Sequence, residues 1–226
     1  MIGNPASCID HTLLTPAATT AQILELCEEA VEFGFAAVCV PPCHVATAAG
    51  RLYGSAVRVA GVVGFPCGYN TLRHKVQEAA ELVNVGAEEL DMVASIGRIC
   101  EGRLDLVAEE VAQVVVAAPK VPVKVILECC LLSDEQKRRA AEAVVAAGAA
   151  FVKTSTGFSR AGATLPDVRL LAAVVQGRAG VKASGGIRTL EQCRDFLAAG
   201  ATRIGTSSGV AIVQQWQQAR EASDNV

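Results

Sequence analysis

The stretch GAAFVKTSTGF, residues 148–158, joins a glycine turn to a short apolar segment that ends at a lysine. Gly148 is typical of the residue that closes a helix, because glycine adopts the left-handed conformation without steric cost. The apolar residues before Lys153 predict a buried strand, and a polar loop with Thr154 and Gly157 follows it. Lys153 is either an exposed residue at the end of an edge strand or an amine at the mouth of a barrel.

The same helix-closing glycine occurs at three other places along the chain. Gly34, Gly86, Gly148 and Gly200 each follow a predicted helix and precede a predicted strand. Their spacings are 52, 62 and 52 residues, and each spacing is long enough for two strand–helix units. The glycines therefore mark every second strand of a repeating fold.

Strands and helices alternate along the chain without an interior linker, which predicts a parallel sheet. Eight strand–helix units in 226 residues predict a (β/α)8 TIM barrel, an α/β fold that forms a single domain over residues 1–226. The alternative is an open, doubly wound sheet. Its dinucleotide-binding motif GxGxxG is missing after the first predicted strand, where residues 10–16 read DHTLLTP. The predicted strands end near Asp10, Val40, Pro66, Asp91, Glu128, Lys153, Gly186 and Ser208.

Five residues after each marked glycine stand Cys39, Asp91, Lys153 and Gly205. In a barrel, alternate strands send side chains into the same interior layer, so these residues are expected to face inward together near the C-terminal mouth. A thiol, a carboxylate and an amine are unusual in an apolar layer, and they indicate a catalytic layer in which Gly205 leaves room for a ligand. Cys39 is either a small buried hydrophobe or, if it faces the mouth, a thiol that aldehydes would alkylate.

Lys182 lies on the predicted strand next to that of Lys153. Two ammonium groups in a buried site lower the pKa of one of them, and a neutral lysine attacks a carbonyl group to form a Schiff base. Asp91 would then transfer protons. The alternative is a structural ion pair between Lys153 and Asp91. Lys124 is a competing interior lysine, but it lies earlier in its strand and is expected to be deeper and structural.

Two glycine-rich segments follow the last two predicted strands: SGGIR at residues 184–188 and GTSSG at residues 205–209. Such turns before helices expose backbone N–H groups that bind anions, and TIM barrels often hold phosphate at these two loops. The alternative is ordinary helix capping by Thr189 and by Ser207 or Ser208. Taken together, the interior lysines and these loops predict a Schiff-base enzyme that acts on a phosphorylated carbonyl compound.

The composition argues against several other classes. The formal charge is −3 with acids and bases mixed, so a nucleic-acid-binding surface is not expected. No apolar run reaches the roughly 18 residues of a membrane span, and the N-terminus lacks a signal-peptide pattern. Nine cysteines without a disulfide framework indicate reduced thiols in the cytoplasm. No His or acidic cluster indicates a metal, and no cofactor is expected.

The chain also resembles a known family, the deoxyribose-phosphate aldolases. The resemblance extends from Ile9 to Gly209. It rests on the ordered motifs IDHTLL, AAVCV, VVGFP, ELDMV, KVILE, FVKTSTGF, VKASGGIR and RIGTSSG. It implies a class I aldolase that interconverts 2-deoxy-D-ribose 5-phosphate with D-glyceraldehyde 3-phosphate and acetaldehyde, in deoxyribose phosphate catabolism.

The resemblance also implies roles for individual residues. Lys153 would form the Schiff base, Asp91 and Lys182 would transfer protons, and Asp10 would contact a substrate hydroxyl. Thr154 is a further candidate substrate contact. The phosphate contacts would be Gly157, Gly185, Gly186, Arg188, Gly205, Ser207 and Ser208.

The sequence departs from the family pattern in several places. Thr15 stands where many relatives have lysine, and Phe158 stands where some have another lysine after the glycine. The segments VASIG at residues 93–97 and Glu128-Cys129-Cys130 also differ from the commoner forms, and the tail REASDNV lacks a terminal tyrosine. These departures bear on rate and substrate preference more than on reaction class.

Two other functions remain open from the sequence. One is a different Schiff-base lyase of phosphorylated aldehydes, with another aldehyde donor. The other is a sugar-phosphate-binding barrel without catalysis. The protein is expected in the cytoplasm, as a possible homo-oligomer (dimer or tetramer), with no nucleic-acid or membrane partner.

Overall fold

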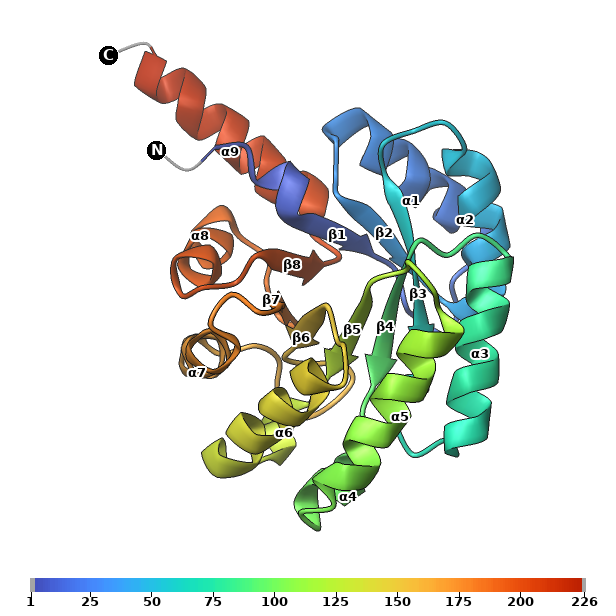
Figure 1. Cartoon of the computed structure of the whole chain (residues 1–226). Helices are drawn as coiled ribbons and strands as arrows, with labels where there is room; N and C mark the ends of the chain where they lie inside the picture. The colour runs from blue at the N-terminus through green and yellow to red at the C-terminus, as the bar shows by residue number, and fades with distance from the viewer. Residues whose placement is uncertain (1–2, 225–226) are drawn as a thin grey trace.

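The computed structural model describes residues 3–224, which form a closed barrel of eight parallel strands surrounded by helices (Figure 1). Each strand pairs with the next in chain order, and the first also pairs with the last. This closure confirms the predicted (β/α)8 barrel and excludes the open sheet. The strands are β1 (Ile9–Thr12), β2 (Ala37–Val40), β3 (Arg58–Val63), β4 (Glu89–Val93), β5 (Val123–Ile126), β6 (Phe151–Lys153), β7 (Gly180–Ser184) and β8 (Arg203–Thr206).

The helices pack around the outside of the barrel (Figure 1). They are α1 (Thr20–Phe33), α2 (Val45–Leu52), α3 (Leu72–Asn84), α4 (Ile96–Cys100), α5 (Leu104–Ala117), α6 (Asp134–Ala146), α7 (Leu165–Val175), α8 (Leu190–Ala198) and α9 (Gly209–Asp224). Three short 3-10 helices are η1 (Pro5–Cys8), η2 (Pro42–His44) and η3 (Cys129–Leu131). The last two residues of the REASDNV tail lie outside the described part of the chain.

The sequence predictions of local structure missed one helix and placed several strand ends two or three residues too late. Helix α4 was not predicted, because five residues are too few to show a helical period. The fifth strand was expected to run to Glu128 but ends at Ile126, since Glu128 takes a left-handed backbone conformation with φ 54°. Both differences lie at the ends of strands, where loops depend on tertiary contacts.

The repeated glycines do close helices, as the sequence predicted. Gly34 is the left-handed C-cap of α1, and Gly86 and Gly200 also have positive φ. At Gly86 a Cβ atom would come within 2.6 Å of the Cβ of Ala49, so close approach to a neighbouring helix adds a second requirement for glycine. These turns fix where each marked strand begins, and hence which of its residues face inward.

The barrel has an apolar outside and a charged inside. Aliphatic side chains fill the space between the strands and the helices. The interior holds a small apolar cluster, Cys39, Ala60 and Val62, together with several buried charged residues. These charged residues are Asp10, Glu89, Asp91, Lys124, Lys153 and Lys182. Because buried charges are costly unless they are paired, a layer of this kind indicates a site rather than a packing core.

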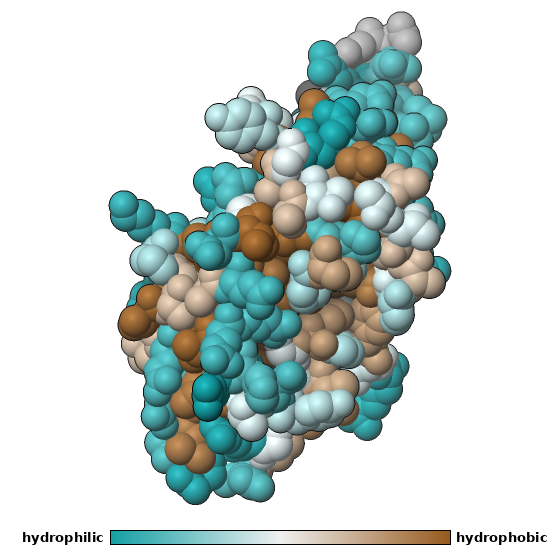
Figure 2. Space-filling model, turned by 90° about the vertical axis from the view of Figure 1, so that its right-hand side faces the viewer, coloured by the Kyte–Doolittle hydropathy of each residue, from teal (hydrophilic) through white to brown (hydrophobic). Residues whose placement is uncertain are grey.

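The outer surface is mixed. Figure 2 shows small groups of hydrophobic residues separated by hydrophilic ones on the face that it presents. The large apolar side chains with the greatest exposure among residues 3–222 are Tyr53 (94%), Tyr69 (83%) and Val116 (79%). No helix between residues 3 and 224 is long and apolar enough to cross a membrane.

A buried ion pair outside the barrel connects two helices to the end of a strand. Lys75 of α3 is fully buried, and its Nζ lies 3.1 Å from Glu110 Oε2 of α5. It also donates to the carbonyl oxygen of Val93, and Glu110 accepts from the backbone N–H of Ser95 at 2.7 Å. The pair therefore ties two helices to the C-terminal end of β4.

We expect Lys75→Met to lower the free energy of unfolding by about 3–5 kcal/mol, because it leaves the Glu110 carboxylate buried without its cation. The double variant Lys75→Met/Glu110→Gln is the matched control and should regain most of the loss, since glutamine still accepts from Ser95. Urea unfolding measures both changes. A double variant no more stable than the single one would contradict this account.

Candidate active site

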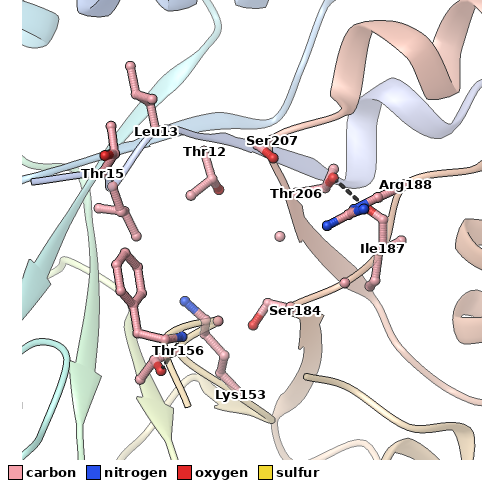
Figure 3. Close-up of a pocket in the computed structure, with 16 residues that line it drawn as sticks. Thr12, Leu13, Thr15, Lys153, Thr156, Ser184, Ile187, Arg188, Thr206 and Ser207 are labelled. Carbon is pink, nitrogen blue, oxygen red and sulfur yellow. Dashed lines mark hydrogen bonds between the residues drawn. The ribbon is translucent and has the colours of Figure 1, made fainter. Parts of the chain in front are cut away.

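A cavity of about 450 Å³ opens at the carboxyl ends of the strands. It is lined by Lys153 and by four segments, residues 12–15, 156–158, 184–188 and 205–207 (Figure 3). These segments lie at the C-terminal ends of β1, β6, β7 and β8 and in the loops after them. The cavity therefore lies where ligands bind in this fold, because loops after the strands converge there.

Lys153 is the last residue of β6, and only 3% of its side chain is exposed. Its strand neighbours hold it in register with Ile126 of β5 and Lys182 of β7. The Nζ atom donates to Asp91 Oδ2 at 2.7 Å. In Figure 3 the amine points toward the centre of the cavity. A buried amine at a cavity wall is therefore present where the sequence predicted one.

Asp91 joins three lysines through one carboxylate. Its Oδ2 accepts from Lys153 at 2.7 Å and from Lys182 at 2.6 Å, while its Oδ1 accepts from Lys124 at 2.7 Å. Burial by itself would raise the pKa of Asp91, but the three ammonium groups outweigh it and hold that pKa well below its usual range. Asp91 is therefore ionised in this layer. It can accept a proton only when the effect of the neighbouring ammonium groups weakens relative to that of burial.

Lys182 bridges two carboxylates, with Nζ 2.5 Å from Asp10 and 2.6 Å from Asp91. Burial opposes its charge, yet the two carboxylates raise its pKa above the ordinary lysine value. Lys124 Nζ lies 2.7 Å from Glu89 Oε2 and 2.7 Å from Asp91 Oδ1. Lys182 is thus held as a cation beside Lys153.

The pKa of Lys153 is lowered from its ordinary value. The largest cause is burial, which disfavours the charged form; Asp91 opposes the change, and the positive charge of Lys182 adds to it. The sequence predicted a lowered pKa from two ammonium groups in a buried site. In the structure both causes act in this direction, and desolvation in the barrel interior is the greater of the two.

Two members of the charged layer were missed from the sequence. Glu89 and Arg203 stand at the starts of β4 and β8, and Arg203 Nη1 donates to Asp10 (2.5 Å) and Glu89 (3.2 Å). Glu89 could have been found, because it lies two residues before Asp91 and so on the same face of its strand. The buried carboxylates of Asp10, Glu89 and Asp91 are thus paired with Lys124, Lys182 and Arg203 as well as with Lys153, and Arg58 reaches Glu89 at 3.1 Å.

Six of the predicted substrate contacts line the cavity, and three do not. Those that line it are Gly157, Gly185, Gly186, Arg188, Gly205 and Ser207. Asp10 is fully buried between Lys182 and Arg203. The Thr154 hydroxyl accepts from the backbone N–H of Ser184, and Ser208 donates its N–H to Thr206 Oγ1, so these two act within the loops.

Gly205 also has a role in the packing of its neighbours. A Cβ atom there would lie 2.9 Å from Ser184 Cβ and 3.0 Å from Lys182 Cε. Under 3.0 Å such a contact forces a shift of the neighbouring group. The glycine therefore leaves room for Ser184 and for the Lys182 side chain at the edge of the cavity.

Several hydroxyl groups that the sequence argument missed also face the cavity. Thr12, Thr156, Ser184 and Thr206 lie around it in Figure 3. Thr206 Oγ1 donates to the carbonyl oxygen of Ile187 and so connects the loops after β7 and β8. With Arg188 and the glycine N–H groups, this side of the cavity is suited to an anion.

Another part of the cavity wall is apolar and includes Leu14 and Phe158. Leu14 and Phe65 pack against the cluster that contains Cys39. Phe158 meets Phe65 edge to face with 5.4 Å between ring centroids. Cys39 is fully buried, and burial raises the pKa of its thiol to about 11. This position favours the reading of Cys39 as a small buried hydrophobe, because the reactive thiolate is suppressed.

Within residues 3–224 there is no group of three or more His, Cys, Asp or Glu side chains placed to hold a metal ion. The charged layer instead pairs acids with lysines and arginine. The site therefore combines a buried amine whose pKa is lowered, an ionised carboxylate and a rim suited to an anion.

Sequence comparison places the chain among known aldolases. A model of the DeoC/LacD family of aldolases matches residues 6–215. A deoxyribose-phosphate aldolase of Syntrophotalea carbinolica is 51% identical over 218 residues, covering 96% of this chain and 99% of the relative. Another, from Geobacillus sp., is 53% identical over 215 residues and covers 95% of this chain and 96% of its own.

The fold agrees with the sequence match. A tetrameric deoxyribose phosphate aldolase from Aeropyrum pernix is similar with a TM-score of 0.89 and 36% identity, over 94% of this chain and 91% of that one. The family model spans nearly the whole barrel, including every strand that contributes to the charged layer. The chain therefore belongs to the DeoC/LacD family of aldolases.

Proposed function

We propose that this protein is a class I aldolase that cleaves 2-deoxy-D-ribose 5-phosphate reversibly to D-glyceraldehyde 3-phosphate and acetaldehyde, a step in deoxyribose phosphate catabolism. The observation that carries this proposal is the buried Lys153 amine, with its lowered pKa, in the wall of a cavity that has an anion-binding rim. The names of the relatives described above support the choice of substrate.

The geometry suits a Schiff-base mechanism. The neutral Lys153 amine attacks the C1 aldehyde, and loss of water gives an iminium ion. The C2–C3 bond then breaks, its electron pair moves into the iminium to form an enamine, and the C3 hydroxyl gives up its proton. Asp91, with Lys182 and a water molecule, accepts this proton. Protonation of the enamine and hydrolysis of the resulting iminium then release acetaldehyde.

The substrate phosphate would occupy the anion-binding rim. Gly157, Gly185 and Gly186 present backbone N–H groups there, and Arg188 supplies a positive charge. The carbon skeleton then extends from the rim to Lys153. Asp10 is buried beneath the cavity and positions the Lys182 ammonium group, rather than touching the substrate.

The test is a retro-aldol assay in which acetaldehyde release from deoxyribose 5-phosphate is followed with an alcohol dehydrogenase and NADH. We expect turnover with this substrate, and in the synthetic direction with acetaldehyde as donor. Turnover with dihydroxyacetone phosphate or pyruvate but not acetaldehyde would favour another Schiff-base lyase. Thermal stabilisation by the sugar phosphate without turnover would favour a binding protein.

We also propose that the protein acts in the cytoplasm as a homo-oligomer. All nine cysteines are free thiols, which suits a reducing compartment. The Aeropyrum pernix relative is described as tetrameric. Light scattering gives the number of subunits, and a monomer at micromolar concentration would contradict the second part.

A further inference from the structure

Glu128 has an unusual backbone for a buried residue. Its φ and ψ are 54° and 62°, and only 3% of the residue is exposed. The other non-glycine residues with positive φ in the described chain, Lys120 and Gln176, are exposed and lie just after helices. A left-handed conformation is strained for a non-glycine residue, and such strain often marks a functional site.

The Glu128 carboxylate is aimed at the loop that follows Lys153. Its two oxygens accept from the backbone N–H of Thr156 at 3.3 and 3.4 Å, and Oε2 also accepts from the Thr156 hydroxyl. The Thr156 hydroxyl oxygen in turn accepts from the N–H of Phe158 at 3.0 Å. The amides on both sides of Gly157 are therefore engaged.

The N–H of Gly157 is left for a ligand. No hydrogen-bond partner for it occurs among residues 3–224, and Gly157 lines the cavity with φ 86°. The network around Glu128 thus holds a short loop in which the one unbonded amide belongs to a residue that lines the cavity. An N–H group fixed in this way recognises an anion without the entropy cost of ordering the loop.

Lys153 is held by other contacts. Its carbonyl oxygen accepts from the N–H of Leu127 at 3.0 Å, its strand is paired on both sides, and its amine is bonded to Asp91. Loss of the Glu128 carboxylate therefore releases residues 156–158 while the amine stays in place. The consequence falls on binding of the anionic group more than on the chemical step.

We propose that Glu128 is a positioning residue that presents the Gly157 N–H to the substrate phosphate, and so sets the preference for phosphorylated over unphosphorylated substrate. This inference rests on the proposed aldolase function. No lysine or arginine lies within ion-pair distance of Glu128 in the described chain, so its role depends on hydrogen-bond geometry rather than on a counter-ion.

Two variants distinguish the effects of the Glu128 carboxylate, of its negative charge and of the backbone strain. Glu128→Gly removes the carboxylate and also relieves the left-handed strain, so it is expected to remain folded. Glu128→Gln keeps an acceptor oxygen for Thr156 but removes the negative charge. KM and kcat are measured for each with 2-deoxyribose 5-phosphate and with unphosphorylated 2-deoxyribose.

For Glu128→Gly we expect KM for the phosphorylated sugar to rise about 10–100-fold, kcat to fall less than about 3-fold, and KM for the unphosphorylated sugar to stay within about 2-fold. Glu128→Gln should show the same pattern at about 3-fold. Gln176→Gly is the matched control, because it removes a left-handed residue far from the cavity, and it should leave both KM values unchanged.

Two further readouts keep this inference separate from the proposed function. Acetaldehyde and borohydride should still label Lys153 in Glu128→Gly at the wild-type rate, since that reaction needs no phosphate. If the wild type fails to cleave the sugar phosphate, the proposed function fails, and thermal stabilisation by inorganic phosphate then tests Glu128 by itself, with a loss expected in Glu128→Gly.

Three results would overturn the role of Glu128. Equal losses on both sugars would show a general structural effect, and unchanged KM values in both variants would show no role. A lower KM for the phosphorylated sugar in Glu128→Gln would show that the carboxylate repels the phosphate. If Glu128→Gly does not fold, Glu128→Gln decides between these results.

Discussion

Replacement of Lys153 by methionine is expected to reduce retro-aldol activity by at least about 10⁴-fold. Loss of a covalent nucleophile removes the whole Schiff-base route, and such losses are on the order of 10⁴–10⁶-fold in enzymes that depend on one. Methionine has a similar length, and it leaves Asp91 with two of its three cations, Lys124 and Lys182. The variant should therefore stay folded, which circular dichroism and urea unfolding will check.

The nucleophile is identified by reducing the Schiff base that it forms with acetaldehyde. Acetaldehyde and sodium borohydride should leave an ethyl group on Lys153 of the wild type and no adduct at residue 153 of the variant, as located by peptide mass spectrometry. Lys120→Met changes an exposed lysine and serves as the control with full activity. An adduct on Lys182 or Lys124 in the wild type would refute the assignment.

Replacement of Lys182 by methionine is expected to have the second largest effect, a fall in kcat of about 10²–10⁴-fold together with a shift in pH dependence. Lys182 lowers the pKa of Lys153 and competes for the same Asp91 oxygen. Without it, Asp91 interacts more strongly with the Lys153 ammonium, and a repelling charge is lost. Both changes raise the pKa of Lys153.

The sign of the pH shift follows from the reactive form. Lys153 attacks as the neutral amine, so activity rises with pH as its ammonium loses a proton, and a higher pKa moves the acidic limb of the pH–rate profile to higher pH. Lys182→Arg is the matched variant: arginine stays charged, so its acidic limb should lie closer to that of the wild type even if its rate is low. An acidic limb at lower pH in Lys182→Met would contradict the model.

Glycine positions and apolar patterns predicted the barrel correctly because they report on local backbone conformation and on which residues are buried. Gly86 and Gly200 close helices as predicted, and counting from them placed Asp91 in the interior. Helix starts were equally readable: Ser133 and Gln136 form a reciprocal capping box. These features depend on residues within one turn of each other, and a single sequence contains them.

The details of the site depend on contacts between distant strands. Arg203 and Asp10 are 193 residues apart and meet only because β8 closes against β1. Gly205 accommodates the Lys182 side chain for the same reason, since β7 and β8 are adjacent. Sequence patterns show which residues face inward, but they do not show which inward residues touch.

The sequence by itself determined the (β/α)8 barrel, the inward lysine on the sixth strand and the glycine-rich loops that line the cavity, because each follows from short-range patterns of glycine, apolar and polar residues. The tertiary structure alone decided that burial is the main cause of the lowered Lys153 pKa, that Asp10 lies below the cavity, and that Glu128 is turned toward Thr156. Desolvation and side-chain contacts of this kind arise only when the barrel closes and brings separate strands together.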